Sequence, residues 1–438
     1  MNKNNKPNIP EFVLFILERL KGAGHKAFVV GGALRNAMFQ RPITDWDVAT
    51  SASTREIKTI FSDVKSFALK HGTVTLVLSK QHFDVTPFRG KIASLEDDLA
   101  RRDFTINAMA LDLEKTEITD PFDGQMDIKR KQIRAVGNPK VRFQEDPLRL
   151  LRAVRLATEL RFKIEAATLE TIPCMAPLLQ KVATERIREE FTNILMSPKP
   201  STGFDLMRRT GLLKQFLPEL LEGYRKRQNT HHRYTIYRHI MKNIDRVEPV
   251  QFLRLTALFH DIAKPRVRKK VEGKWRFLGH EGASADLAAE ILGRLKFSHP
   301  LITRVINLIR HHMIGYNSQW SDAAVRRLIR RVGPENILDL MRFRRSDILA
   351  HGLNNHGLDS LNELQERIKN QMRGPVPTKT RDLAIDGQTV MEILSLPAGP
   401  EVGRILQLLM EKVIDHPERN TKSRLITILK QISAPDLL

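Results

Sequence analysis

The chain has 438 residues, of which 72 are Lys or Arg and 50 are Asp or Glu, so its formal net charge is +22 at pH 7. This length is too great for one ordinary hydrophobic core and predicts two to four domains. The positive residues recur in almost every segment, which favours polyanionic partners such as nucleic acids over a merely soluble basic protein.

The cellular compartment is predicted from cysteine usage and hydropathy. Cys174 is the only cysteine in the sequence, which excludes a disulfide framework and a thiolate metal cluster. The first seven residues are polar and lack the apolar core of a signal sequence. No apolar stretch approaches the length of a membrane span. We therefore expect a cytoplasmic protein with no membrane partner.

Residues 1–140 alternate between strand-like and helix-like segments, whereas the chain from Glu145 onward is almost entirely helical in pattern. The expected early elements are a helix over 10–22, a strand over 26–30, a helix over 55–61 and a strand pair over 73–78 and 82–88. The expected later helices are 145–160, 184–195, 203–212, 234–246 and 251–263. This order predicts an α+β protein, in which a small head of strands and helices precedes a long all-α body.

Two proline-rich breaks divide the helical part, at 197–200 and at 374–377. With the change of pattern near residue 140, they predict four segments. These segments are 1–140, 141–200, 201–370 and 371–438.

The run Phe28–Asn36, followed by Thr44–Asp47, is the strongest local signal. Gly31 and Gly32 allow a tight turn between a buried strand and a helix, where the backbone can approach phosphate. Asp45 and Asp47 alternate on the next strand, so both carboxylates face one way. Either half alone favours an ordinary turn or solvated aspartates. Together they favour a site for two divalent metals and a triphosphate, as nucleotidyl transfer requires.

Two further segments carry polar groups whose roles the spacing leaves open. Asp84, on the strand over 82–88, is either a third carboxylate beside Asp45 and Asp47 or an edge-strand charge. The segment 101–107 offers two arginines, which suit triphosphate because they are permanently charged bidentate donors, and a carboxylate that suits ribose hydroxyls.

The segment Glu145–Arg149 has two interpretations. Asp146 followed by Pro147 is typical of a helix N-cap with a first-turn proline. Asp146 and Arg149 also stand three residues apart, so they share a helix face and could read a base edge. Asp accepts from the exocyclic amine of cytosine or adenine and Arg donates to the neighbouring ring nitrogen, whereas guanine and uracil present the opposite pattern. Spacing alone favours the cap.

The sequence resembles the bacterial class II tRNA nucleotidyltransferases, which are the CCA-adding enzymes and their poly(A) polymerase relatives. The stretches that carry the resemblance are Val30–Arg35 with Asp45–Asp47, Arg101–Ala110, Asp120–Gly124, Glu145–Arg149 with Arg152, and Glu185–Glu190. It implies a DNA-polymerase-beta-type head with a mixed sheet, followed by a helical neck, body and tail that grip tRNA.

The resemblance also implies the roles of the site residues. Asp45 and Asp47 would be the catalytic Mg²⁺ ligands, and Asp146 and Arg149 would select CTP and ATP without a nucleic-acid template. This implied role overturns the preference for a simple cap. The nucleotide-binding set is Gly31, Gly32, Arg35, Arg101, Arg102, Asp103, Asn107, Asp146, Arg149 and Arg152.

Two departures from the family pattern have consequences. Asn36 stands where the family usually has Asp, for which we expect a changed local hydrogen bond rather than inactivity. Only residues 90–100 separate Arg89 from Arg101, whereas members that complete the whole CCA end carry a longer flexible loop here. The short loop predicts addition of the two cytidines only, with a companion enzyme supplying the terminal A. The alternatives are a full CCA-adding enzyme and a poly(A) polymerase.

The helical body carries a second resemblance, to the HD phosphohydrolase superfamily. His239, His260, Asp261, His280, His311 or His312, and Asp347 occur in that superfamily's order and would supply ligands for one or two divalent metals. We expect a metal site. The alternatives are a scaffold that binds tRNA and keeps an idle metal site, and a phosphohydrolase of RNA ends with a vestigial head.

Two other segments are assigned a contact with RNA or solvent. A hairpin expected between the metal-ligand segments carries Lys269, Lys270, Lys274 and Arg276, which indicates a solvated or RNA-backbone face. The tail segments 383–387, 397–403 and 420–421 resemble the C-terminal part of HD-containing members, which implies binding to the tRNA elbow.

Overall fold

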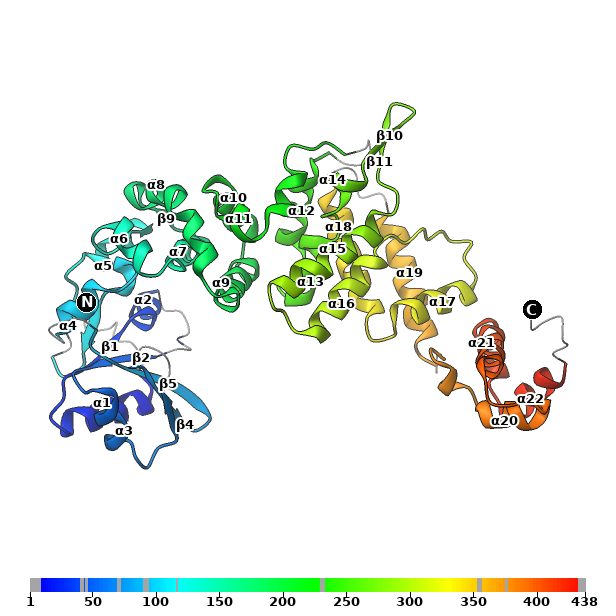
Figure 1. Cartoon of the computed structure of the whole chain (residues 1–438), viewed down its shortest axis with the longest axis horizontal. Coiled ribbons are helices and arrows are strands. Elements are labelled where there is room, and N and C mark those ends of the chain that lie inside the picture. Colours follow the sequence, from blue (N-terminus) through cyan, green and yellow to red (C-terminus); the bar gives the residue numbers. More distant parts are fainter. Residues whose placement is uncertain are drawn as a thin grey trace. The chain divides into compact units, whose positions relative to one another are not determined.

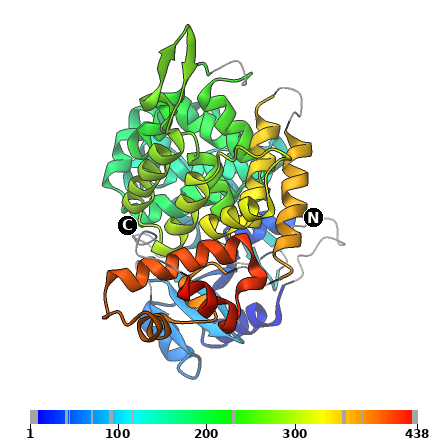
Figure 2. The ribbon, with the colours of Figure 1, turned by 90° about the vertical axis from the view of Figure 1, so that its right-hand side faces the viewer.

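The computed structural model describes residues 9–39, 43, 46–68, 72–89, 94–115, 117–228, 233–352, 357–374 and 377–431. It divides into two compact units, Met1–Pro218 and Glu219–Leu438, which are described separately (Figures 1 and 2). The finer division into four segments stays a prediction. Among the described residues, no helix is both long enough and apolar enough to cross a membrane.

The first unit is built on a seven-stranded mixed sheet. Its strands are β1 (Ala27–Val30), β2 (Asp47–Thr50), β3 (Ser66–Ala68), β4 (Val74–Leu78), β5 (Gln81–Pro87), β6 (Ala110–Asp112) and β7 (Glu117–Thr119). They lie in the order β3-β4-β5-β2-β1-β6-β7. The β2–β5 pair is parallel and the other neighbours are antiparallel. The predicted head of strands and helices is confirmed.

Helices cover the sheet and complete the head. They are α1 (Glu11–Gly22), α2 (Gly32–Met38), α3 (Thr54–Ile60), α4 (Leu95–Ala100), the 3-10 turn η2 (Thr105–Asn107) and α5 (Gly124–Arg130). Ser53 and Glu56 form a capping box that starts α3. Helices α1 and α3 touch each other and pack on the sheet.

Helix α4 covers the sheet face that carries Asp47. Because Val30 pairs with Asp47 and side chains alternate along a strand, Val30, Asp47 and Ala49 share one face. Leu95 and Leu99 of α4 bury Val30 and Ala49 in one apolar cluster. Asp47 thus lies where the covered face ends.

The rest of the first unit is helical. It contains the short parallel pair β8 (Gln132–Ile133) and β9 (Lys163–Ile164), and the helices α6 (Pro139–Glu145), α7 (Arg149–Leu160), α8 (Ala166–Met175), α9 (Thr184–Met196), α10 (Pro200–Arg209) and α11 (Leu212–Phe216).

Two of the predicted helices are interrupted. The helix expected over 145–160 is wrong as one element, because α6 ends at Glu145 and α7 begins at Arg149. Pro147 disfavours helical geometry at the residue before it, and Asp146 is extended with φ −145° and ψ 98°. The helix expected over 203–212 likewise breaks at Gly211, which has φ +75°.

Among its described residues, the second unit has helices, their connecting loops and one hairpin. Its helices are α12 (Ile236–Arg246), α13 (Gln251–Phe259), α14 (Lys264–Val267), α15 (His280–Arg294), α16 (His299–Arg310), α17 (Asp322–Val332), α18 (Ile337–Ala350), α19 (Leu358–Gln371), α20 (Gly387–Leu394), α21 (Pro400–Asp415) and α22 (Lys422–Lys430). The hairpin, β10 (Lys269–Val271) and β11 (Lys274–Arg276), lies where the sequence predicts it.

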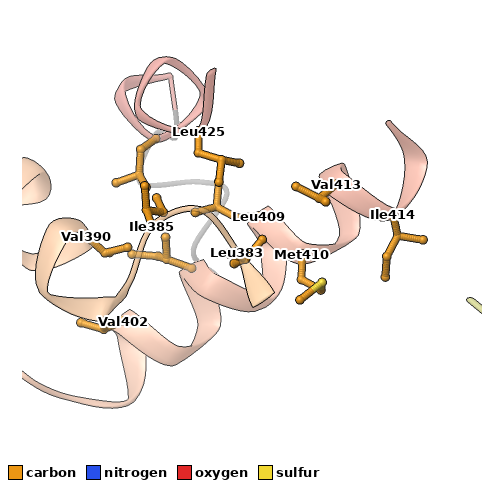
Figure 3. Close-up of a cluster of buried hydrophobic side chains, with 11 residues drawn as sticks. Leu383, Ile385, Val390, Val402, Leu409, Met410, Val413, Ile414 and Leu425 are labelled. Carbon is orange, nitrogen blue, oxygen red and sulfur yellow. The ribbon is translucent and has the colours of Figure 1, made fainter. Parts of the chain in front are cut away.

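The last three helices have an apolar core of their own. Val390 of α20, Val402 and Leu409 of α21 and Leu425 of α22 point into it (Figure 3). Arg326 of α17 binds this tail, because its guanidinium donates to the carbonyls of Ile414 and Asp415 at the end of α21. A cation at a helix C-terminus satisfies carbonyls that have no partner within the helix.

Candidate active site

The glycine turn after β1 is shaped by the carboxylate opposite it. Gly31 has φ +78°, which favours glycine. A Cβ added there would lie 2.8 Å from Asp47 Oδ2 and 3.2 Å from Arg102 Nη1. A side chain at position 31 would therefore displace both charged groups.

Of the three carboxylates predicted for the site, only Asp47 is found in the cavity lining that the described residues form. Asp47 begins β2 and lines a cavity of about 850 Å³. Asp45 lies outside the described residues. Asp84 pairs in register with Asp47, so its side chain shares that face, but its carboxylate accepts a 2.6 Å hydrogen bond from Thr75 Oγ1. Asp84 is not among the cavity-lining residues, and its role as a third carboxylate stays a prediction.

The cavity is lined mainly by arginines. Six arginines face four carboxylates, in addition to glycines and Asn107. The arginines are Arg89, Arg101, Arg102, Arg149, Arg152 and Arg186, and the acids are Asp47, Asp103, Glu145 and Asp146. Guanidinium groups remain charged in proteins and match phosphate oxygens in pairs, so this lining suits a triphosphate.

A buried carboxylate orients Arg102. Asp98 of α4 is fully buried, and its Oδ2 accepts hydrogen bonds from Arg102 Nε and Nη2 at 3.1 and 3.0 Å. Its Oδ1 accepts the backbone N–H of Arg89 at 3.2 Å. The Nη1 of Arg102 is directed toward the glycine turn. Sequence reasoning did not single out Asp98, although its spacing from Arg102 is that of a helical i,i+4 pair.

A chain of buried ion pairs joins the head to the neck helices. Arg152 of α7 donates to Asp103 Oδ2 and to Glu190 Oε1, both at 3.1 Å, and Arg155 donates to Glu190 Oε2 at 2.6 Å. Burial would raise the pKa of Asp103, but Arg152 and hydrogen bonds from Asn107 and the Phe104 N–H lower it to about 2. Burial alone would lower the pKa of Arg152, but the carboxylates of Asp103 and Glu190 raise it.

Asn107 is held between two charged residues. Its amide donates to Asp103 Oδ1 at 3.0 Å, and its Oδ1 accepts from Arg35 Nη1 at 2.6 Å. Arg35 does not line the cavity, so it orients Asn107 from behind. Asn36 Oδ1 accepts weaker hydrogen bonds from Arg35, at 3.2 and 3.4 Å. Position 36 thus contacts Arg35, and the expected effect of Asn in place of Asp stays a prediction.

Asp146 and Arg149 both line the cavity, but each is also fixed by neighbouring groups. Asp146 accepts two hydrogen bonds from Arg186 of α9 and one from the Leu148 N–H. Arg149 donates to the carbonyls of Arg101 and Arg142 and to Glu145. The predicted N-cap is wrong, because Leu148 is the N-cap of α7 and does not cap it through its side chain, whereas Asp146 is the C-cap of α6. Arg186 is a cavity residue that sequence reasoning did not assign.

The second unit brings the predicted histidines and aspartates together. Three overlapping groups of ligand atoms lie within 4.8 Å of one another, formed by His239, Asp347 and His351, by His239, His260 and Asp261, and by Asp261, His280 and His312. His312 occupies the cluster, whereas His311 is only partly buried. His351 was not predicted, although it follows Asp347 by one helical turn.

Backbone carbonyls fix the orientation of the four buried imidazoles. The Nδ1 atoms of His239, His260, His280 and His312 lie 3.3, 3.0, 2.8 and 2.6 Å from the carbonyls of Ala350, Ala257, Phe277 and Ile309. A carbonyl only accepts, so each Nδ1 carries hydrogen. Each Nε2 faces inward, where it can offer a lone pair to a metal once it has no proton.

The centre of this cluster favours a cation. Burial alone would lower the pKa of His260, but the carboxylates of Asp261 and Asp347 raise it to about 9. Asp261 Oδ1 is buried and has no hydrogen-bond partner among the described residues. A buried carboxylate oxygen without a donor, beside inward-facing imidazole nitrogens, is the donor set that a divalent metal takes.

Comparison with known proteins agrees with this geometry. A family model described as "Poly A polymerase head domain" matches residues 27–134, one described as "Probable RNA and SrmB- binding site of polymerase A" matches 161–223, and one for tRNA nucleotidyltransferase domain 2 matches 269–429. The CCA-adding enzyme of Pediococcus pentosaceus is 31% identical over 437 residues, covering 96% of this chain and 98% of that protein.

Shorter alignments and solved structures give the same relationship. The CCA-adding enzyme of Streptococcus suis is 43% identical over 211 residues, which span 45% of this chain and 52% of that protein. The Bacillus stearothermophilus CCA-adding enzyme in complex with CTP is 27% identical, with a TM-score of 0.73 over 96% of each chain. The Thermotoga maritima enzyme complexed with tRNA shares the fold, at 20% identity and a TM-score of 0.58 over 97% of each chain.

The mixed-sheet head, the glycine turn and the arginine-lined cavity define a class II tRNA nucleotidyltransferase. The chain belongs to the CCA-adding enzyme family. The predicted class of enzyme is confirmed.

The buried carboxylate of Glu190 can be tested directly. Glu190→Gln turns an amide nitrogen toward one of two guanidiniums and leaves a buried charge less compensated, so we expect a loss of about 3 kcal/mol in the free energy of unfolding. The KM for CTP rises because Arg152 loses its support. The measurements are urea denaturation and steady-state kinetics. The adjacent, exposed Glu189→Gln is the control, expected within about 0.5 kcal/mol of the unmodified protein. Equal effects of the two changes would contradict the assignment.

Proposed function

We propose that the chain is a template-independent nucleotidyltransferase that adds nucleotides to the 3′ end of tRNA, with CTP as its main substrate. The observation that carries this proposal is the single cavity that joins the Gly31 turn, Asp47 and six arginines. Support comes from relatives that are named CCA-adding enzymes and from similar structures described in complex with CTP, ATP or tRNA.

Different residues of the proposed site have different roles in the reaction. The tRNA 3′-oxygen attacks the α-phosphorus of the nucleotide, the bond to pyrophosphate breaks, and the hydroxyl proton is lost. Asp45 and Asp47 are suited to hold Mg²⁺, which would lower the pKa of that hydroxyl and neutralise the leaving pyrophosphate. Arg101 and Arg102 bind phosphate oxygens.

Asp103 is the candidate for contact with the ribose. Its carboxylate accepts three hydrogen bonds, from the Phe104 N–H, Asn107 and Arg152. A carboxylate has about four lone-pair sites, so one remains for a ribose hydroxyl.

Asp146 and Arg149 are proposed to select the base. Both line the cavity, and their hydrogen bonds to fixed neighbours hold the two side chains in place. The carboxylate accepts from the exocyclic amine of cytosine or adenine while the guanidinium donates to the ring nitrogen. Uracil and guanine place an acceptor and a donor at these positions and are rejected.

Asp47→Asn tests the catalytic assignment. The change keeps the size of the side chain but removes a charge that Mg²⁺ requires, so incorporation from labelled CTP into tRNA lacking CCA falls below detection. Binding of that tRNA stays within about twofold, because the arginines are intact. Asp63→Asn, at an exposed position, is the control and retains incorporation. Loss of tRNA binding by the Asp47 variant would show that Asp47 is misassigned.

Addition of only two cytidines is the finer part of the proposal. Of residues 90–100, Leu95–Ala100 form α4, which is anchored in the head core by Leu95 and Leu99 and orients Arg102 through Asp98. Only four residues, Gly90–Ala93, separate Arg89 from the N-cap Ser94. A segment this short is not expected to work as the flexible loop that enlarges the base pocket for adenine. A companion enzyme would then add the terminal A. Full CCA addition is the alternative, favoured by the names of the relatives, and poly(A) synthesis is a third candidate.

The stop after two cytidines has a direct assay. Given tRNA lacking CCA together with CTP and ATP, we expect products that end at the second added nucleotide, read on a sequencing gel. Supplied with tRNA that already ends in CC and with ATP alone, the protein adds nothing. A product one adenylate longer would establish full CCA addition, and a long A tract would establish poly(A) synthesis.

A second activity is proposed for the histidine cluster of the second unit. The four inward-facing Nε2 atoms fit one or two divalent metals, together with the Asp261 oxygen that accepts no hydrogen bond from the described residues. Such metals would activate water to hydrolyse a phosphate ester, such as a 2′,3′-cyclic or terminal phosphate. Lys264 and Arg344, which line the adjoining cavity of about 380 Å³, suit the phosphate charge.

Two measurements, of metal retention and of hydrolysis, distinguish this activity from an idle metal site. After incubation with Mn²⁺ and desalting, we expect the unmodified protein to retain the metal and the Asp261→Asn variant to lose it. His299→Ala, at an exposed position, is the control and is expected to retain the metal. With Mn²⁺ or Ni²⁺, we expect hydrolysis of 2′,3′-cyclic AMP, measured as phosphomonoester formed. Metal retention without hydrolysis would contradict the second activity and leave a scaffold with an idle metal site.

A further inference from the structure

The β10–β11 hairpin concentrates positive charge on one projection. Residues 268–276, called the basic arm below, contain five cations and one acid, Glu272. The cations are Arg268, Lys269, Lys270, Lys274 and Arg276. Both views show the hairpin standing out from the helices of its unit (Figures 1 and 2).

The five cations of the basic arm lack, within the described part of the chain, the acidic partners that several other arginines of the same unit have. Arg266, Arg294 and Arg310 each pair with a carboxylate at 2.7 to 2.8 Å. None of the basic-arm cations forms an ion pair with the residues that the structure describes. Concentrated, unpaired and exposed positive charge repels itself and is typical of a surface that binds a polyanion.

The register of the hairpin arranges these charges in rows. Lys269 pairs with Arg276 and Val271 with Lys274, so these side chains share one face. Lys274 and Arg276 are two residues apart, about 6.6 Å along the strand, a spacing comparable with that of phosphates in an extended nucleic-acid strand. On the other face, the Arg268 guanidinium stacks on the Trp275 ring at 3.4 Å, which stiffens the base of the hairpin.

The basic arm leads directly into the metal-ligand cluster. After β11 the chain passes through Phe277 and Leu278 to His280, and Arg276 lines the same cavity as the histidines. The cavity rim carries two exposed apolar side chains, Leu278 at 84% and Met313 at 57% exposure. Exposed apolar groups beside cations suit a nucleobase attached to a phosphate chain better than a free inorganic phosphate.

We propose that the basic arm binds the phosphodiester backbone of an RNA strand whose phosphorylated end enters the histidine cavity. This inference rests on the proposed second activity and names its substrate: the end of an RNA chain, not a free mononucleotide. A mononucleotide reaches only the cavity, whereas an oligonucleotide also contacts Lys269 and Lys274, which share one face of the hairpin.

Photocrosslinking from position 278 tests the inference without requiring hydrolysis. Leu278→p-benzoylphenylalanine is introduced into the full chain, and a short 5′-labelled RNA with a 3′-phosphate is the probe. We expect a crosslink at the terminal nucleotide. The double variant K269Q/K274Q raises the half-maximal RNA concentration by about tenfold. The slope of log K against log salt becomes smaller by about 1.4, because two phosphate contacts are lost.

Charge-preserving substitution provides the matched control. K269R/K274R keeps the crosslink and the salt slope. The inference is overturned if the Gln variant crosslinks like the unmodified arm, if the Arg variant loses as much as the Gln variant, or if no crosslink forms at the terminal nucleotide. An arm-dependent crosslink without phosphate release would refute the second activity while leaving RNA binding established. Hydrolysis of 2′,3′-cyclic AMP is expected to be unchanged in the Gln variant.

Discussion

The ion-pair chain Asp103–Arg152–Glu190 is the interaction on which the nucleotide cavity depends. It joins a head segment to two neck helices, and each of its members is wholly or largely removed from water. Charges in such a place are tolerated only when paired and hydrogen-bonded. The depressed pKa of Asp103, about 2, contributes stability that is present above its unfolded value and is lost as the pH falls toward 2. The pairing therefore holds at every pH near neutrality.

The same principle explains how four of the six cavity arginines are held close together. Like charges repel, and for Arg102, Arg149, Arg152 and Arg186 an acceptor fixes the guanidinium before any phosphate arrives. Arg102 has the buried Asp98, Arg149 has two backbone carbonyls and Glu145, and Arg186 has Asp146. The donors that remain face the cavity already oriented, which reduces the cost of ordering them around a triphosphate.

Local patterns in the sequence predict the parts of the site that local chemistry determines. The Gly31 turn and the position of Asp47 on β2 follow from residue types and strand alternation, whereas the convergence of the histidines on one centre was implied by a family resemblance. The break at Pro147 was also available in the sequence, since proline disfavours a helical residue before it. The periodic apolar pattern on either side outweighed it in the prediction of a single helix.

Residues that act across the fold could not be found in this way. Glu190 and Arg186 lie about forty residues from the groups they bind. Both fall in the stretch Glu185–Glu190 that carries the family resemblance, but nothing local indicates which groups they bind. The family resemblance assigned Arg35 to the nucleotide-binding set, yet the structure places it behind Asn107. His351 adds a ligand to the cluster only because α18 ends next to His239. Such roles depend on tertiary packing rather than on spacing.

The central claim is that protein side chains, held by this frame, choose the nucleotide without a nucleic-acid template. The most direct test is the ratio of kcat/KM for CTP to that for UTP in Arg149→Ala, with tRNA lacking CCA as the acceptor. A bidentate contact to a base edge discriminates by about 1–3 kcal/mol, so we predict that the ratio falls by about tenfold or more while CTP is still incorporated. An unchanged ratio, whatever the loss of rate, would contradict selection by Arg149.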